Sequence, residues 1–148
     1  MRIYLDVCCL NRPFDDQTQK RIHLESEAIL VILEQCQRRV WELINSQAIE
    51  NEIAHIPDSE RRKRVEILSQ LAHSKVEVNI EIEHRAEEFE RLGFAPFDAL
   101  HIACAESARA GIFLTTDDEL SNRALRNNRI LKVRVENPVK WLMEVLIK

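Results

Sequence analysis

Four acidic residues in separate segments of the chain have the right chemistry to share a divalent cation. Asp6 lies near the end of the apolar run RIYLDV, and Asp117 directly follows the run IFLTT. Glu52 lies one to two turns into a predicted helix, and Asp98 lies in the first turn of another. Carboxylate oxygens are the ligands that Mg²⁺ and Mn²⁺ prefer. These residue types therefore predict a site for Mg²⁺ or Mn²⁺.

Asp98 is the most informative of the four, because its surroundings are apolar. It belongs to the stretch FAPFDALHIACAESA, which leaves almost no polar helix face. An unpaired carboxylate in such a place costs several kcal/mol or takes up a proton. A bound cation would be the partner that makes the buried charge tolerable.

Each acid also has a purely structural interpretation. Thr116 and Glu119 fit a capping box in which Thr116 is the helix N-cap. Acids in a first helical turn, such as Asp98, are also favoured by the helix dipole. Glu50 is a near competitor of Glu52. The four acids together are therefore stronger evidence for a metal site than any one of them.

The order of predicted elements indicates how these acids could meet. Short β-type runs alternate with amphipathic or buried helices, which predicts a three-layer α/β/α sandwich with a mainly parallel central sheet. Ligands in such folds bind at the carboxyl ends of the strands. A loop is expected through Asn11 and Pro13. The predicted strands span 2–7, 40–45, 76–79, 112–116 and 130–135, and the predicted helices span 17–38, 46–56, 58–74, 80–92 and 96–110, with two more that begin at Asp117 and near Pro138.

Composition indicates one globular domain over residues 1–148. Hydrophobic residues make up 45% and charged residues 31% of the chain, and no apolar run is long enough to cross a bilayer. No signal peptide is recognised, so we expect a cytoplasmic protein without a membrane partner. The net charge of −4 argues against non-specific coating of nucleic acid. The four cysteines show no metal or redox spacing.

Four segments, IYLDV, SQAIENEIA, FDALHIACA and FLTTDDEL, together resemble the PIN-domain nucleases, in particular the compact bacterial VapC-like toxin ribonucleases. The resemblance covers nearly the whole chain. It implies a metal-dependent endoribonuclease that hydrolyses RNA phosphodiester bonds and uses Mg²⁺ or Mn²⁺. It also implies a small antitoxin protein as partner and a homodimer.

The resemblance assigns roles to individual residues. The four family acids fall on Asp6, Glu52, Asp98 and Asp117, with Asp118 as the alternative for the last position. Thr115 or Thr116 matches a hydroxyl that often accompanies the fourth acid. The candidates for substrate contact are Asn11, Arg12, Thr115, Thr116 and Arg123.

One departure from the family pattern leaves an alternative open. The family commonly has Ser or Thr directly after its first aspartate, where this chain has Val7, Cys8 and Cys9. A non-catalytic PIN-like scaffold that binds RNA or protein is therefore the alternative function. Aspartate-nucleophile phosphatases and receiver domains fit less well, because Cys8 stands where the phosphatases need a second aspartate and the receivers' paired acids are missing.

Two further features have ordinary structural interpretations. His101 lies three residues after Asp98 on the same helical face, where we expect a hydrogen-bonded packing histidine rather than a metal ligand. The basic run 61–64 can contact RNA phosphates, but such a run is more often a solvated helix face. Arg123 and Arg126 lie closer to the predicted site segments.

Overall fold

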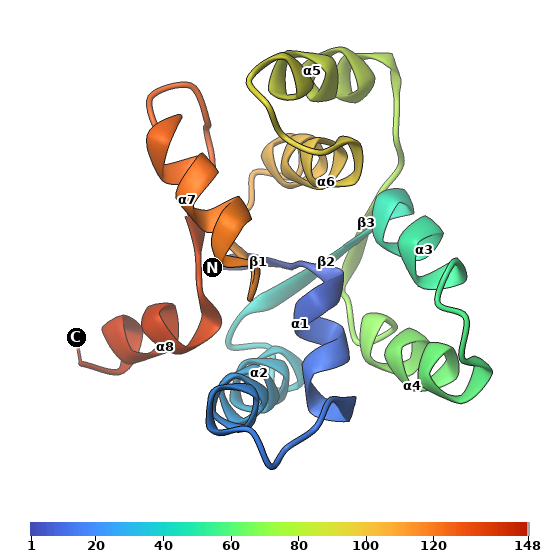
Figure 1. Ribbon diagram of the computed structural model, residues 1–148, viewed down its shortest axis with the longest axis vertical. Helices are drawn as coiled ribbons and strands as arrows, with labels where there is room; N and C mark the ends of the chain where they lie inside the picture. The colour runs from blue at the N-terminus through green and yellow to red at the C-terminus, as the bar shows by residue number, and fades with distance from the viewer. Residues whose placement is uncertain (148) are drawn as a thin grey trace.

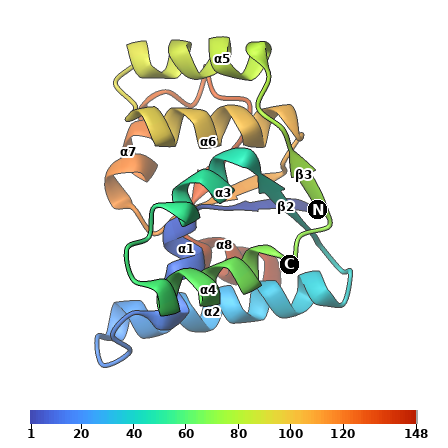
Figure 2. The same ribbon diagram turned by 90° about the vertical axis from the view of Figure 1, so that its right-hand side faces the viewer.

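The protein forms a central parallel β-sheet with helices on both faces. A computed structural model describes residues 1–147. All four strand pairings are parallel, and the strand order is β3-β2-β1-β4-β5. Helix α6 covers one face and carries α5 on its outer side, and α2 and α8 lie on the opposite face (Figures 1 and 2). The predicted three-layer α/β/α sandwich is thus confirmed.

The sheet is assembled from short strands. The elements are β1 (Arg2–Leu5), α1 (Val7–Asn11), the 3₁₀ turn η1 (Arg12–Phe14), α2 (Lys20–Gln37), β2 (Glu42–Ser46), α3 (Gln47–Ala54), α4 (Ser59–Ser69), β3 (Ser74–Val76), α5 (Ile80–Arg91), α6 (Pro96–Ser107), β4 (Ile112–Leu114), α7 (Asp118–Arg126), β5 (Val135–Glu136) and α8 (Pro138–Ile147).

The three inner strands β2, β1 and β4 are largely buried because both faces of the sheet are covered. Tyr4 of β1 pairs in register with Ile44 of β2 and Phe113 of β4, and all three are buried. Near-continuous apolar runs are typical of such strands. Their parallel direction brings the ends of β1, β2 and β4 to the same edge of the sheet.

Several element boundaries differ from the sequence predictions. The first strand ends at Leu5, because Asp6 caps a short helix, α1, in the segment where a loop was expected. Strand β3 lies at Ser74–Val76, two residues before its predicted start, since Asn79 already caps α5. The last strand is only Val135–Glu136, where it pairs with Phe113 and Leu114.

The helix that carries Asp98 is as buried as its sequence predicts. Ala99, Ile102 and Cys104 have no exposed surface, and α6 packs against both α5 and α3. Among residues 1–147, none of the helices combines the length and the apolar character needed to cross a bilayer.

Candidate metal centre

Asp6 occupies the junction between β1 and α1 with its carboxylate held on both oxygens. As the N-cap of α1 it accepts a hydrogen bond from the Val7 amide at 2.8 Å, while the Thr115 hydroxyl donates to its other oxygen, also at 2.8 Å. The Cys8 thiol donates to that same oxygen at 3.4 Å. Thr115, across the sheet edge, thus supplies the hydroxyl that is missing from the residues after Asp6.

Burial and neighbouring charges set the ionisation of Asp6. Burial raises the pKa of the Asp6 carboxyl, and the negative charge of Glu52 raises it further. His101 and the Thr115 hydroxyl oppose this shift without cancelling it. The ionised form of Asp6 is therefore disfavoured in the protein without a cation.

The Glu52 side chain extends from α3 toward Asp6. The Ser46 hydroxyl caps this helix by accepting from the Ile49 amide at 3.0 Å, which sets where the helix begins. Glu52 then accepts a hydrogen bond from Nε2 of His101 at 2.8 Å. Single ligand atoms of Asp6, Glu52 and His101 lie within 4.8 Å of one another. Glu50, the competing acid, instead pairs with Lys75 at 2.5 Å.

Asp98 lies one residue after Phe97 in the first turn of α6, which begins at Pro96. Burial raises the pKa of its carboxyl to about 6, and the charges of Asp6 and Asp117 add to that shift. These acids therefore interact electrostatically, although Asp98 and Asp117 lie outside the tight group around Glu52.

The structure separates the roles of the two aspartates after β4. Asp117 is the N-cap of α7 and accepts from the amides of Glu119 and Leu120, so the alternative structural interpretation in which Thr116 caps this helix is wrong. An aspartate preceding two free helical amides is a better cap than the threonine before it. Asp118 forms two bonds of 2.7 Å to the Arg21 guanidinium, which lowers the pKa of its carboxyl.

A cavity of about 200 Å³ opens beside Asp98 and Asp117. Arg123 of α7 contributes a guanidinium to its wall. Gly93 lies beneath that guanidinium with a positive φ of 101°, and a Cβ there would be 2.4 Å from the Arg123 Nη1. The backbone conformation therefore favours glycine at this position, whereas the contact with the flexible end of the arginine could be relieved by a shift of that side chain.

The other candidate substrate residues are engaged within the protein. Arg12 pairs with Glu25 at 2.9 Å and with Asp15 at 3.1 Å. Asn11 donates to the carbonyl of Val7 and accepts from Arg61. Thr115 is fully buried on Asp6, and the Thr116 amide donates to the Cys8 sulfur at 3.4 Å. Among the predicted substrate contacts, only Arg123 lines the cavity beside Asp98 and Asp117.

The donor set fits a divalent cation. Asp6, Glu52, Asp98 and Asp117 offer carboxylate oxygens from four segments, and burial together with neighbouring negative charges raises the pKa of Asp6 and of Asp98. A hard cation would stabilise the ionised carboxylates against both effects. His101 is hydrogen-bonded as expected, but its contact with Glu52 was not anticipated, because helix periodicity relates it only to Asp98.

Comparisons with known proteins agree with this architecture. The sequence profile of the PIN domain matches residues 3–125. A chain of the crystal structure of VapBC2 from Rickettsia felis bound to a DNA fragment from their promoter has a similar fold, with a TM-score of 0.58 and 14% identity over 93% of this chain and 98% of that one. A search of curated proteins gave no match. Because this family profile spans most of its length, the chain belongs to the PIN domain family.

Proposed function

We propose that the protein is a metal-dependent endoribonuclease and the toxin of a toxin–antitoxin pair. The observation that carries the proposal is the gathering of four acids from four segments at one sheet edge, where burial and mutual repulsion raise the pKa of Asp98 to about 6. Membership of the PIN domain family supports a nuclease. The fold shared with a chain of VapBC2 from Rickettsia felis is compatible with a toxin role.

Asp6, Asp98 and Asp117 would hold the cation, and Glu52 would hold a ligand water or a second ion. A bound Mg²⁺ or Mn²⁺ would polarise the scissile phosphate and lower the pKa of a water nucleophile. Thr115 and the Val7 amide keep the Asp6 carboxylate in place during the reaction. Arg123, which lines the cavity beside Asp98 and Asp117, would bind a phosphate of the RNA.

The test is cleavage of a labelled single-stranded RNA by the purified protein. We expect cleavage with Mg²⁺ or Mn²⁺, none with EDTA, and products that carry a 5′-phosphate and a 3′-hydroxyl. Calorimetry should show divalent-ion binding that is lost in Asp6→Asn. A wild-type chain that binds no Mg²⁺ or Mn²⁺ would contradict the nuclease and favour the scaffold.

Thr115→Val is expected to weaken Mg²⁺ binding. The substitution keeps the side-chain volume but removes the hydroxyl that donates to Asp6 at 2.8 Å and accepts from the Asp117 amide at 3.1 Å. Loss of a group that orients a metal ligand typically costs 10- to 100-fold in affinity, so we expect about 10-fold by calorimetry. Thr115→Ser is the matched control and should stay near the wild-type affinity; equal losses in both would contradict this role.

Arg123→Ala is expected to reduce RNA affinity and its salt dependence. One phosphate contact fewer lowers the slope of log affinity against log salt by about 0.7 on single strands. Fluorescence anisotropy with Ca²⁺ in place of Mg²⁺ measures binding without turnover. Arg126→Ala, on the same helix and outside the wall of the cavity, is the control. A slope changed equally by both variants would show that no single phosphate site exists at Arg123.

The toxin role requires a small antitoxin protein, and a homodimer is the expected assembly. If an antitoxin is encoded beside this chain, its co-expression should suppress RNA cleavage and yield a stable complex. Sedimentation of the purified chain tests the dimer. Growth arrest on expression of the chain alone, relieved by the neighbouring gene, would support the toxin.

A further inference from the structure

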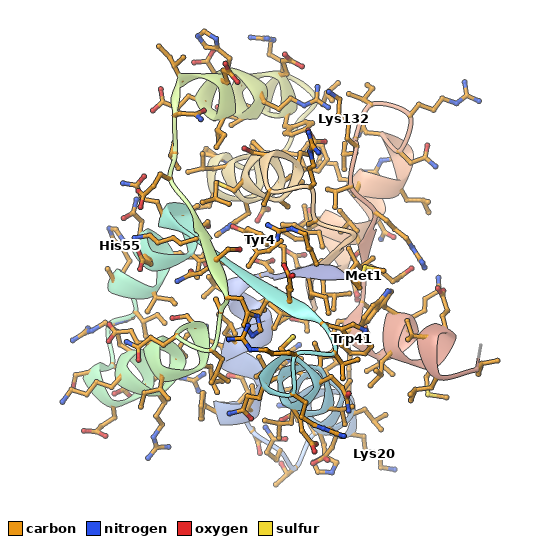
Figure 3. All side chains as sticks on the ribbon, turned by 180° about the vertical axis from the view of Figure 1, so that it is seen from behind. Met1, Tyr4, Lys20, Trp41, His55 and Lys132 are labelled. Atoms are coloured by element: carbon orange, nitrogen blue, oxygen red, sulfur yellow. The ribbon has the colours of Figure 1, made fainter. Side chains whose placement is uncertain are left out.

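A chain of buried hydrogen bonds runs from β2 through β1 and α6 and ends on Glu52. The hydroxyls of Ser46 and Tyr4 are 2.7 Å apart, and the Tyr4 hydroxyl is 2.7 Å from Nδ1 of His101. Nε2 of His101 then lies 2.8 Å from Oε1 of Glu52. Ser46, Tyr4 and His101 are fully buried, and Figure 3 shows Tyr4 between the sheet and α6.

His101 is the donor in its hydrogen bond with Glu52. An ionised Glu52 only accepts, so Nε2 of His101 must carry a hydrogen. When the ring is neutral, Nδ1 accepts from the Tyr4 hydroxyl, and the Tyr4 oxygen can accept from Ser46. When the ring is protonated, Nδ1 donates to Tyr4, and Tyr4 donates to Ser46. The Nε2 hydrogen faces Glu52 in both cases.

The side chains packed around the His101 ring restrict its rotation. The Tyr4 ring meets the His101 ring edge-on with centroids 5.8 Å apart, and Phe97 lies over its other side at 6.2 Å. Burial keeps the pKa of the Tyr4 hydroxyl well above its usual value, so this hydroxyl stays protonated and can donate or accept as His101 requires. The imidazole is therefore fixed in position.

We propose that His101 is a positioning residue that orients the Glu52 carboxylate at the metal centre without binding the ion itself. The inference rests on the proposed function, in which Glu52 holds a ligand water or a second ion. Glu52 is a partly exposed side chain with three rotatable bonds, so fixing Oε1 in advance reduces the entropy lost when its other oxygen engages a ligand. The buried Tyr4 and Ser46 in turn hold the imidazole.

The same geometry also allows His101 to be a ligand of the cation, and this second role predicts a different protonation of its ring. His101 could instead donate a ring nitrogen to the cation together with Asp6 and Glu52, because their ligand atoms lie within 4.8 Å of one another. That role requires Nε2 to give up its hydrogen, since Nδ1 is occupied by Tyr4. The presence or absence of the Nε2 hydrogen in the Mg²⁺-bound protein therefore separates the two.

Two amide substitutions test the two ring nitrogens of His101 separately. The amide of His101→Gln can reach the place of Nε2 and retain the bond to Glu52, whereas the amide of His101→Asn stands near the place of Nδ1 and retains only the bond to Tyr4. By calorimetry we expect His101→Gln to bind Mg²⁺ within about threefold of wild type and His101→Asn to lose about 10-fold or more. Equal affinities for the two variants would overturn the proposal. Thermal unfolding of both variants controls for a general loss of stability.

Nitrogen-15 NMR of the wild-type protein provides a test that needs no variant. We expect His101 to show a hydrogen on Nε2 both before and after saturation with Mg²⁺. Loss of that hydrogen on binding would make His101 a ligand and overturn the proposal. Wild-type Mg²⁺ binding without RNA cleavage would instead overturn the ribonuclease and leave the positioning role standing.

Discussion

Asp98→Asn is expected to abolish RNA cleavage and at the same time to raise the unfolding temperature of the cation-free protein. The asparagine keeps the shape of the side chain but removes a charge that burial and the neighbours Asp6 and Asp117 disfavour. Loss of groups that merely support a metal ligand costs 10- to 100-fold, so removal of a ligand should reduce the cleavage rate by more than about 100-fold. A gain in stability together with a loss of activity is expected at sites where function requires a destabilising arrangement of charges.

The pH dependence of stability follows from the same carboxyl. Its pKa is raised in the folded protein from 3.8 to about 6, so folding is helped while the group is protonated. In the absence of a cation, this contribution is fully present below about pH 4 and is lost as the pH rises through 6. Denaturant unfolding at several pH values should therefore show a fall in stability across that window that is weaker in Asp98→Asn. An unchanged pH profile in the variant would contradict the assignment.

Asp118→Asn is the matched control for that experiment. Asp118 stands beside Asp117 in the sequence, but its carboxylate is bound by Arg21 through two bonds of 2.7 Å. We expect RNA cleavage by Asp118→Asn to stay within about twofold of wild type, because losing one surface ion pair costs at most about 1 kcal/mol of stability. If this variant lost cleavage while Asp117→Asn kept it, Asp118 would be the fourth acid.

Glu25→Ala is expected to destabilise the protein by about 3 kcal/mol. Glu25 is 1% exposed, and its carboxylate accepts bonds from Arg12 at 2.9 Å, from Arg21 at 3.1 Å and from the Asn137 amide at 2.7 Å. Removal of this buried acceptor leaves Arg12 paired with Asp15 and Arg21 paired with Asp118, and it breaks the hydrogen bond that joins α2 to Asn137 at the start of α8. At about 2–4 °C per kcal/mol for a chain of this size, the unfolding temperature should fall by roughly 6–12 °C in calorimetric scans.

Glu27→Ala serves as the control for Glu25. Glu27 is on the same helix, but its side chain is 62% exposed and its contact with His23 is a weak one of 4.0 Å. Its removal should change the free energy of unfolding by no more than about 0.5 kcal/mol. A similar small effect for Glu25 would show that the buried cluster contributes little, because the cost of desolvating its charges offsets their attraction.

The fold could be predicted from local patterns because its elements carry strong signals. Both ends of the helix between Ile80 and Arg91 and the start of the buried helix at Pro96 were predicted to within one residue, since a final glycine and a proline start mark them. The buried helix ends at Ser107, three residues before its predicted end. The short helix α1 was missed, because VCCLN has β-type composition. The Asp6 carboxylate caps the N-terminus of these residues and so stabilises them as a helix.

The strands at the two edges were the least predictable elements. Strand β5 comprises only Val135–Glu136, although the run from 130 to 135 alternates like a longer strand. Its length is set by β4, whose three residues provide the available pairing positions. A neighbouring strand is a tertiary feature that no local pattern contains.

The sequence by itself determined the fold class, the family and the four acids that could meet at the sheet edge, because strand ends and apolar surroundings are local features. Only the tertiary structure decided how each of them is used. It bound Asp118 to Arg21 and Arg12 to Glu25, placed Thr115 on Asp6, and brought His101 to Glu52. These pairs are separated by 13 to 109 positions in the chain, so their contacts depend on how strands and helices pack and not on residue spacing.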